Sequence, residues 1–530
     1  MTWTNMNKCL CAMLFTLGLA EPLGSQAAPS LIVLITVDQL RPDYLEAFAP
    51  QLRGGLARLT RGGAWFTNAY HDHAITETAP GHATLLAGRF PRSTGIMANR
   101  IGVVDDSAPL LGAVSNAALG ASPRRFRGTT LVDWLRAKDS KARSLSVSMK
   151  DRGAILPVGS ARTDVYWYDP SGVFTTSTYY RASLPEWVNR FNSRKLPQSF
   201  AGKAWTLLLA DTAYKEPDSV SIERAGRDFV FPHLLPRDSA GAADWVRLTP
   251  WIDGTTLALA LEGVSALGLG DGKRTDLLAV SLSATDLIGH AYGPDSREMH
   301  DNVLRLDQSL GVFLDSLFRL RDSSRVAVVL TSDHGIGTIP ELAARTVTPM
   351  PVRVDGNELA AMLNAIVSAK GIDTNSVQLD QQIVLADRNA LKAQRPALDS
   401  ALDQFARQVR SLTGIGRVDH FRDLLSGDTV SDPIARRWVH QLPAASNVEM
   451  VITLTPYSTF GGNVASHGSP YDYDAHVPII FYGAWFSHRR CTQFARTVDI
   501  APTLAEVARV EPSEKLDGRA LGCALNAIRP

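Results

Sequence analysis

Three apolar, β-branched runs in the chain are each followed at once by acidic, hydroxyl and histidine residues. The runs are Leu31–Val37, Asp276–Leu282 and 325–330, and a fourth run, 477–482, comes shortly after a Ser-His-Gly sequence. Continuous apolar runs of this length are typical of strands buried on both faces, as in a parallel sheet. Ligand and catalytic residues of open α/β sheets gather at the carboxyl ends of the strands, so the polar residues indicate a site at that edge.

Helical patterns alternate with these strands. Between the second and third runs, apolar residues recur at helical spacing, at Val303, Leu306, Leu310, Phe313, Leu314 and Leu317. The segments 51–61 and 498–510 are predicted to form two further helices. This alternation predicts an α/β fold with a doubly wound, mostly parallel central sheet flanked by helices.

Two long segments fit such a core poorly, and we expect them to be insertions over the C-terminal edge of the sheet. Residues 157–273 are rich in Tyr, Trp, Pro and Ser, and residues 340–463 mix helical patterns with short strands. The aromatic residues of the first insertion predict a small local core or, alternatively, the lining of a substrate pocket. The predicted division has a signal peptide at 1–27, core segments at 28–156, 274–339 and 464–530, and insertions at 157–273 and 340–463.

The charge balance and the N-terminus indicate an exported protein with small-molecule partners. The formal net charge is only +1, so we expect no nucleic-acid partner, which would normally require a clear basic excess. Lys8, the apolar stretch 9–20 and the small residues around 25–27 are typical of a secretory signal cleaved near Ala27, although a buried N-terminal helix is an alternative. No later run approaches the roughly 18 apolar residues of a membrane span. We expect a periplasmic or secreted monomer.

The cysteines give a related expectation. Export would remove Cys9 and Cys11 and leave Cys491 and Cys523. Two cysteines in an oxidising compartment indicate one disulfide that closes a C-terminal loop, and free buried thiols are the alternative.

The sequence TAPGH, which begins at Thr78, has the properties of a nucleophile at a helix start. Pro80 suits the first turn of a helix, and Thr78 would then lie just ahead of the N-terminus. Backbone N–H groups and the helix dipole favour an anion there, so phosphate would bind well and an alkoxide would form more easily. Threonine still needs a group that lowers its pKa, which points to a metal. Thr76 is a rival nucleophile, but it is further from the predicted helix start.

Side chains able to bind metal follow the predicted strands. They are Asp38, Asp286, His290, Asp333, His334 and His467. Mixed Asp and His ligands suit Zn²⁺, and six of them suffice for two ions if water, substrate or Thr78 adds an oxygen to each. Two such ions could stabilise the attacking and leaving oxygens of an in-line phosphoryl transfer. We expect solvated loop positions for His71 and His73, and structural roles for His82 and His476.

Together these motifs resemble the alkaline phosphatase superfamily. They are most similar to its threonine-nucleophile branch, which contains nucleotide pyrophosphatase/phosphodiesterases and phosphate-irrepressible alkaline phosphatases. The resemblance covers nearly the whole mature chain. It implies one Zn²⁺ held by Asp38, Asp333, His334 and Thr78, and a second Zn²⁺ held by Asp286, His290 and His467. It also implies that Asn99 contacts a phosphate oxygen.

The segment around Lys150 and Arg152 resembles the Lys-x-Arg-Gly motif of the monoesterase group. There the Lys and Arg contact the transferred phosphoryl group, and the resemblance implies the same roles here. A phosphate monoester is a dianion, so an ammonium and a forked guanidinium would neutralise its extra charge. A diester would gain little from two cations and would be crowded by them. The alternative is a solvated loop.

The expected function is a zinc-dependent alkaline phosphatase of broad range that hydrolyses phosphate monoesters through a phosphothreonine intermediate. The nearest alternative is a phosphodiesterase or nucleotide pyrophosphatase on the same scaffold. A sulfatase is disfavoured because neither Cys nor Ser occupies the nucleophile position. A phosphate-binding protein without catalysis is the alternative from a different class.

Overall fold

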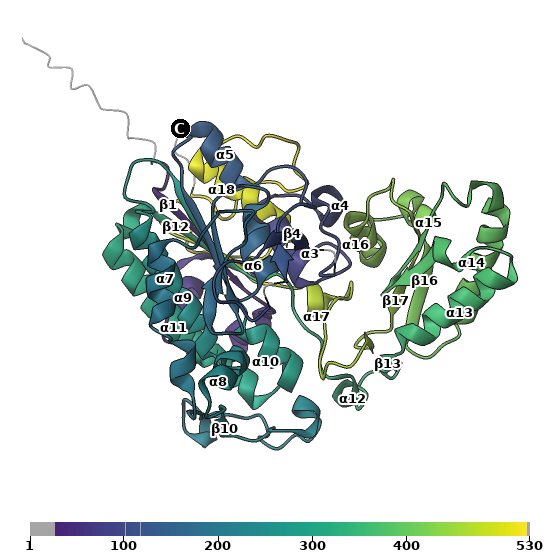
Figure 1. The fold of residues 1–530 in the computed structure, drawn as a ribbon, viewed down its shortest axis with the longest axis horizontal. Coiled ribbons are helices and arrows are strands. Elements are labelled where there is room, and N and C mark those ends of the chain that lie inside the picture. The colour runs from purple at the N-terminus through teal and green to yellow at the C-terminus, as the bar shows by residue number, and fades with distance from the viewer. Residues whose placement is uncertain (1–26, 101, 117, 527–530) are drawn as a thin grey trace, which may run out of the picture.

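The computed structural model describes residues 27–100, 102–116 and 118–526. The predicted leader, apart from Ala27, and both Cys9 and Cys11 lie outside the described residues. Figure 1 shows a large body built on a central sheet and a smaller lobe beside it, formed by residues between about 340 and 463. The body contains all the predicted metal ligands, and the lobe lies next to them.

Within the described residues the body contains a nine-stranded sheet in the order β20-β2-β19-β12-β1-β11-β6-β7-β8. The five strands from β12 to β7 are parallel to one another, whereas β8, β19 and β2 join through antiparallel pairings. The bounds are β1 Leu31–Val37, β2 Ala64–Phe66, β6 Ser144–Ser148, β7 Asp164–Asp169, β8 Val173–Thr175, β11 Asp276–Leu282, β12 Val326–Thr331, β19 Ile479–Tyr482 and β20 Arg489–Cys491. The mostly parallel sheet confirms the fold predicted from the apolar runs.

The central strands are in register, and this brings the site together. Every residue of β1, β11 and β12 is buried, as their unbroken apolar character predicts. Val37 of β1 lies opposite Leu282 of β11, and Thr36 lies opposite Thr331 of β12. The polar residues after each strand therefore leave the sheet at one edge, side by side.

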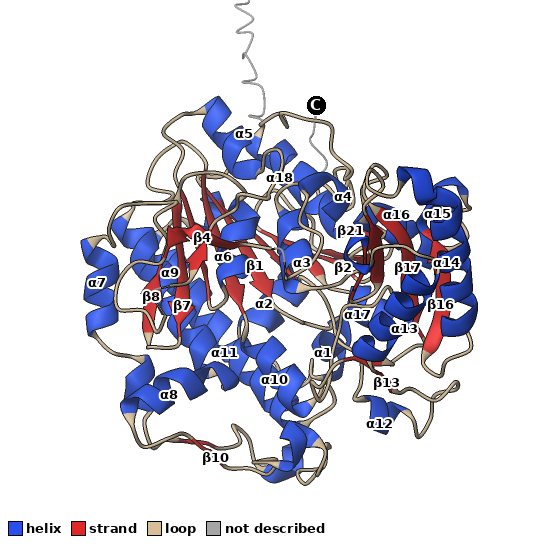
Figure 2. Ribbon diagram, turned by 45° about the vertical axis from the view of Figure 1, so that its right-hand side comes forward, coloured by secondary structure: helices blue, strands red, loops and turns tan. Residues whose placement is uncertain are grey.

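Helices cover both faces of the sheet (Figure 2). Because successive side chains of a strand point to opposite faces, Val33 and Ile35 belong to one apolar cluster, and Ile32 and Leu34 to another. The first cluster includes side chains of α1 Pro42–Ala47, α2 Gly55–Gly62, α7 Glu186–Ser193, α9 Trp251–Ala266, α10 Ala284–Tyr292 and α11 Arg297–Leu320. The second includes side chains of α3 Thr78–Leu85, α5 Leu131–Lys138, α6 Asp151–Ile155 and α18 Ile500–Ala508. The helices predicted around 51–61, 303–317 and 498–510 are present as α2, α11 and α18.

The segment 157–273 differs from the expected insertion. Its strands β7 and β8 extend the main sheet, and its helix α9 packs on that sheet. The sequence of β7, DVYWYD, combines aromatic and acidic residues and so lacks the apolar, β-branched pattern of a central strand. The antiparallel pair of β9 Ala204–Trp205 and β10 His233–Leu234, which are far apart in the segment, contacts α10 and α11. The other domain boundaries stay a prediction.

The lobe has an antiparallel sheet of its own, in the order β14-β15-β17-β16. Its strands are β14 Val377–Asp380, β15 Ile383–Ala386, β16 Ile415–His420 and β17 Val448–Leu454. The helices α13 Gly356–Ala369 and α14 Arg395–Val409 cover one face. On the other face, α15 Phe421–Ser426 and α16 Pro433–Gln441 pack against Ala74 and Ile75 of the body, just before the nucleophile motif.

Cys491 and Cys523 form a disulfide. The bond joins β20, at the edge of the sheet, to the C-terminal segment 32 residues further along the chain. Of the two alternatives for these cysteines, the disulfide is therefore confirmed. None of the helices in the described parts of the chain has both the length and the apolarity needed to cross a bilayer.

A buried charge network joins the lobe to the body. The Asp72 side chain is fully buried, and its carboxylate accepts hydrogen bonds from Nε of Arg436 on α16, at 3.0 Å, and from Nε of Arg496 in the body, at 2.8 Å. His440 Nδ1 lies 3.4 Å from the same carboxylate. Burial alone would raise the pKa of Asp72, but His440 and the two arginines hold it well below its usual range.

We expect Asp72→Asn to lower the free energy of unfolding by about 3–5 kcal/mol, because it removes a buried carboxylate that pairs with two partly buried guanidinium groups. Thermal unfolding at pH 7 would measure the loss. Asp423→Asn, which removes a carboxylate 69% exposed on the lobe, is the control and should change stability by less than about 0.5 kcal/mol. The ion-pair contribution should be present above about pH 4 and lost as the pH falls through the lowered pKa of Asp72. Equal stability of the two variants would contradict an anchoring role.

Candidate active site

The nucleophile candidate lies at the start of α3. Thr78 is the first residue of this helix, one position further in than the sequence predicts, and it is almost fully buried. The N–H of Ala79 donates to Asn99 Oδ1 at 2.8 Å, so Asn99 lies at the same helix end. A Cβ on Gly81 would lie 2.2 Å from the backbone oxygen of Asp333, so only glycine allows α3 to pack this close to the end of β12.

The six predicted metal ligands meet at the edge of the sheet. Asp38 follows β1, and Asp333 and His334 follow β12, whereas Asp286 and His290 lie one turn apart on α10. His467 comes from the loop that precedes α17 Asp472–Ala475. The strand register explains the convergence of the first three, and the i, i+4 spacing on α10 explains that of the next two.

Asp286, His290 and His467 form a compact group that could hold a metal ion. His467 Nε2 lies 3.2 Å from His290 Nε2 and 3.5 Å from Asp286 Oδ1, and His290 Nε2 lies 3.4 Å from the same oxygen. The remaining ring nitrogens are held by the backbone. His290 Nδ1 contacts the oxygen of Ala465 at 2.8 Å, and His467 Nδ1 contacts that of Thr76 at 2.8 Å, so each Nε2 points to the shared centre.

The second group consists of Asp38, Asp286 and His334. The expected set places Asp333 here instead of Asp286. Asp333 Oδ2 lies 3.6 Å from His334 Nε2, but it also lies 3.1 Å from Nδ1 of His82, the structural histidine of the nucleophile motif. Asp286 thus lies within reach of both groups, and the assignment of Asp333 to a metal stays a prediction.

Buried atoms without partners test whether this cluster suits a cation. In the described part of the chain, Asp38 Oδ1, Asp333 Oδ2 and His334 Nε2 are buried and make no hydrogen bond. Buried polar atoms are normally satisfied, and here two are carboxylate oxygens and one is an imidazole nitrogen. Such a donor set fits Zn²⁺ or a similar divalent ion, which would satisfy all three.

Lys150 adds a positive charge to the same centre. Its Nζ lies 2.7 Å from Asp38 Oδ2, 2.5 Å from Asp286 Oδ2 and 3.3 Å from Thr78 Oγ1. Burial would lower the pKa of Lys150, but the carboxylates of Asp286 and Asp38 raise it above its usual value, so the amine is an ammonium. Arg152, on the first turn of α6, contacts Asp151 at 3.4 Å and reaches none of these carboxylates.

The carboxyl groups of Asp38 and Asp286 have pKa values shifted in opposite directions. Burial and the nearby Asp286 and Asp333 hold the pKa of Asp38 well above its usual range. Burial would raise the pKa of Asp286 too, but Lys150 and His290 hold that pKa well below its usual value. Ionising all three acidic groups around one ammonium would leave excess negative charge in a buried place, and a divalent cation would offset it.

Two residues with contacts at the site were not predicted from the sequence. Gln39 donates through Nε2 to Asp286 at 3.0 Å and through its backbone N–H to Asp333 at 3.1 Å. Glu77 accepts the N–H of Asn99 at 2.6 Å. Each residue adjoins a predicted site residue in sequence, and this adjacency was the only available signal.

His71 and His73 were expected on a solvated loop, and that expectation is wrong. Both are fully buried: His71 Nε2 contacts the oxygen of Ser332 at 2.8 Å, and His73 Nδ1 contacts Gln441 Oε1 at 3.1 Å. Burial lowers the pKa of His71 to about 4, so its ring is neutral. Within the described residues neither histidine belongs to a group that could hold a metal.

The fold and the site together define an α/β protein of the alkaline phosphatase-like class. Residues 32–394 match the family described as type I phosphodiesterase / nucleotide pyrophosphatase, and the chain belongs to this family. The resemblance inferred from the motifs is therefore confirmed.

Similar proteins of known name cover almost the whole chain. The chain is 28% identical to the alkaline phosphatase PafA of Elizabethkingia meningoseptica, over 93% of this chain and 94% of that protein. It is 31% identical to the alkaline phosphatase PhoK of a Sphingomonas species, over 93% and 91%. The crystal structure of PafA superimposes with a TM-score of 0.84 at 27% identity, covering 94% of this chain and 99% of PafA.

Proposed function

We propose that this protein is a zinc-dependent alkaline phosphatase that hydrolyses small phosphate monoesters with Thr78 as the nucleophile. The observation that carries the proposal is the position of Lys150, whose ammonium lies between the two possible metal groups and 3.3 Å from Thr78 Oγ1. The similar proteins named alkaline phosphatases support it, because they match over more than nine-tenths of the chain.

Asp38, Asp333 and His334 would hold one Zn²⁺ beside Thr78, and Asp286, His290 and His467 would hold the other. When bound, the two ions supply Lewis acidity that lowers the pKa of the threonine hydroxyl and stabilises the leaving oxygen.

In the first step, Thr78 Oγ1 attacks phosphorus, so that an O–P bond forms while the bond to the leaving alcohol breaks. The helix N-terminus behind Thr78 favours the negative charge of the phosphoryl oxygens. The product is a phosphothreonine, which water then cleaves to restore the hydroxyl and release inorganic phosphate.

Three side chains bind the phosphoryl group during both steps. Asn99 is fixed by its bond from the N–H of Ala79, so its amide can donate to a phosphate oxygen. Lys150 lies beside the attacking oxygen and neutralises one of the charges of a monoester. Arg152 is one-quarter to one-third exposed, and its Nε makes no bond among the described residues, which leaves it able to bind the second charge.

A phosphodiesterase or nucleotide pyrophosphatase is the second candidate, because the matched family carries that description. The cationic side chains of Lys150 and Arg152 distinguish the phosphatase from the phosphodiesterase. A diester has one negative charge, and its second organic group would have to lie where Lys150 and Arg152 bind charged oxygens.

We expect the zinc-loaded protein to hydrolyse p-nitrophenyl phosphate with a kcat/KM at least about 100-fold above that for bis-p-nitrophenyl phosphate, since each charged hydrogen bond contributes roughly 1.5–3 kcal/mol. Both substrates release the same chromophore, so one assay measures both. A higher kcat/KM for the diester would favour the second candidate, and no hydrolysis of either would favour a binding protein.

The disulfide supports an extracytoplasmic location, because disulfides persist in oxidising compartments. Together with the leader predicted at 1–27, it supports a location in the periplasm or outside the cell. The proposal also includes two Zn²⁺ ions per chain, a broad range of monoester substrates and a monomeric protein.

A further inference from the structure

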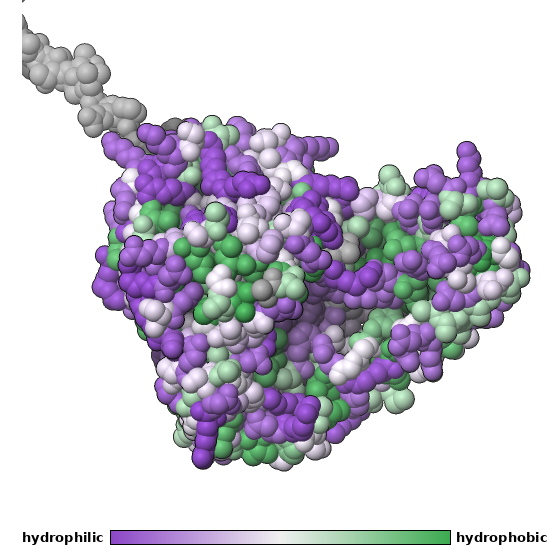
Figure 3. Space-filling view, viewed as in Figure 1, coloured by the Kyte–Doolittle hydropathy of each residue, from purple (hydrophilic) through white to green (hydrophobic). Residues whose placement is uncertain are grey.

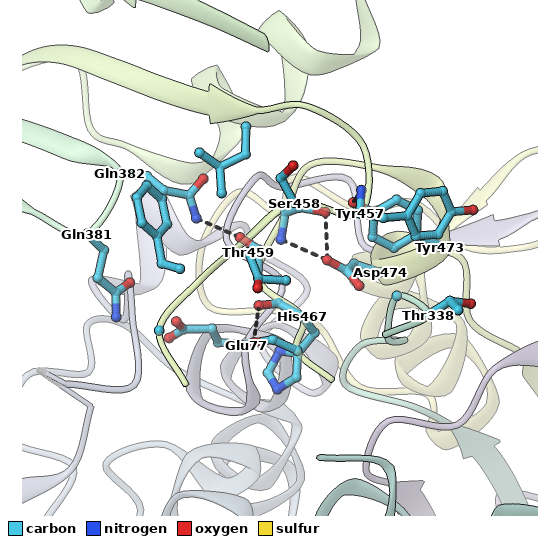
Figure 4. A pocket seen from close by; sticks show the side chains of 17 residues that line it. Glu77, Thr338, Gln381, Gln382, Tyr457, Ser458, Thr459, His467, Tyr473 and Asp474 are labelled. Atoms are coloured by element: carbon cyan, nitrogen blue, oxygen red, sulfur yellow. Dashed lines mark hydrogen bonds between the residues drawn. The ribbon is translucent and has the colours of Figure 1, made fainter. Parts of the chain in front are cut away.

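A cavity of about 270 Å³ opens next to His467, between the nucleophile segment and the lobe. Figure 4 shows Glu77 and His467 on one side of it and Gln381, Gln382 and Thr459 on the other. The molecular surface is also hollowed between the body and the lobe (Figure 3). A cavity of this size suits a small organic group rather than a polymer.

The position of the cavity relates it to the leaving group of the proposed reaction. In an in-line displacement the leaving oxygen departs on the side opposite to Thr78. His467 belongs to the group with Asp286 and His290, which is proposed to stabilise that oxygen, and the same residue lines the cavity. The alcohol attached to the leaving oxygen would therefore extend into the cavity.

Aromatic side chains form part of the wall. The rings of Tyr457 and Tyr473 stack with their centroids 4.3 Å apart, and Phe460 lines the cavity near them. The Tyr473 hydroxyl oxygen accepts a hydrogen bond from the backbone N–H of Tyr457 at 2.9 Å. This contact fixes the pair, so the tyrosines form a rigid surface.

Apart from His467 of the metal group, the charged side chains that line the cavity are carboxylates. Glu77 and Asp474 contribute carboxylates, and none of the described residues that line the cavity is a lysine or an arginine. Asp474 is fully buried; its Oδ2 accepts two bonds from Ser469, at 2.9 and 2.6 Å, whereas its Oδ1 makes no hydrogen bond.

Two arginines near the lining residues in sequence or in space are already paired. Arg100 forms an ion pair with Asp380, and Arg353 binds both carboxylate oxygens of Glu341, at 2.7 and 3.0 Å. Their charges are thus offset by carboxylates, and they do not make the cavity attractive to anions.

We propose that this cavity binds the leaving alcohol and selects phosphate monoesters whose alcohol carries a positive charge on a small apolar body. This inference rests on the proposed phosphatase function. Tyrosine faces attract cations through their ring quadrupole, and Glu77 adds a charge of the right sign. A second anionic group, as in the ester of a hydroxy acid, would meet the same carboxylates and be disfavoured.

Two nearly isosteric esters test the charge preference, 2-(trimethylammonio)ethyl phosphate and 3,3-dimethylbutyl phosphate. The measured quantity is kcat/KM for the charged trimethylammonio ester divided by kcat/KM for the neutral dimethylbutyl ester. This ratio is compared between the parent enzyme and two variants, Tyr457→Leu and Gln381→Lys. Because the intrinsic reactivity of each ester is the same for every variant, a change in the ratio reports the cavity. We expect each variant to lower the ratio about 5- to 10-fold, as loss of a cation–π contact or addition of a like charge requires.

Gln408→Lys is the matched control, because it adds the same charge at an exposed position of α14. It should leave the ratio within about twofold of the parent value, which is the change that loss of the weakest cation–π contact would cause. Ratios unchanged in both Tyr457→Leu and Gln381→Lys would overturn the inference while leaving the phosphatase function intact. If the parent hydrolysed neither ester but cleaved a diester, the proposed function itself would fail.

Discussion

Replacing Thr78 by alanine should reduce kcat/KM for p-nitrophenyl phosphate by at least about 10⁴-fold, the loss typical of removing a covalent nucleophile. The reason is that Thr78 Oγ1 is the hydroxyl placed both at the start of α3 and within 3.3 Å of the Lys150 ammonium. Steady-state kinetics would measure the loss, and acid-quench trapping of phosphoprotein in the parent would be absent in the variant.

Two controls accompany this variant. Zinc content by atomic emission should remain close to that of the parent, because six other side chains are available to hold the metal. Thr76→Ala removes the rival hydroxyl, which donates to the oxygen of Ser469 at 2.9 Å and so has a structural role; it should keep most of the activity. Full activity in Thr78→Ala would end the nucleophile assignment.

Removing both cations, with Lys150→Ala and Arg152→Ala together, should lower kcat/KM for the monoester by about 10²–10⁴-fold and that for the diester by less than about tenfold. Each charged contact to a phosphoryl oxygen contributes roughly 1.5–3 kcal/mol, and the diester offers one charge fewer. The same pair of p-nitrophenyl esters measures both values.

Lys141→Ala, which removes an exposed ammonium from the same region of the chain, is the control and should leave both values unchanged. Equal losses on the two substrates would contradict a monoester-specific role for Lys150 and Arg152. Such a result would remove the reason for preferring a phosphatase over a phosphodiesterase.

The body of the fold could be predicted because its central strands are buried on both faces. A strand such as β1 has to be apolar along its whole length, and this leaves a pattern that no solvent-facing element shares. The strand β7 lies between β6 and the edge strand β8 and does not follow this pattern, although most of its residues are buried. Its aromatic and acidic residues satisfy local contacts, for example Tyr166 with Asp164 at 2.8 Å, so its place in the sheet was not visible from the sequence.

The convergence of the site followed from the strand register and from the Asp-x-x-x-His spacing on α10. The contacts between the lobe and the body could not be predicted from the sequence, because they depend on which surfaces pack together in the folded chain. The burial of His73 involves α16 of the lobe, as its contact with Gln441 shows. His71 is buried by contacts within the body, where its ring nitrogens contact Ser332 and Thr497. The role of Gln39 likewise depends on Gly289, where a Cβ would come within 1.8 Å of its amide oxygen.

The anchoring of the lobe through Asp72 bears on how substrates enter. The buried Asp72 carboxylate bonds Arg436 of the lobe and Arg496 of the body, so we expect the lobe to keep its place during turnover, because moving it away would leave that carboxylate buried with fewer partners. We therefore expect the width of the cleft between the body and the lobe to be fixed by the fold. Substrates would then be selected by whether they fit this cleft and not by closure of the lobe over them. A change in substrate preference during evolution would then come from substitutions among the cavity-lining residues of 454–461, and not from a change in the motion of the lobe.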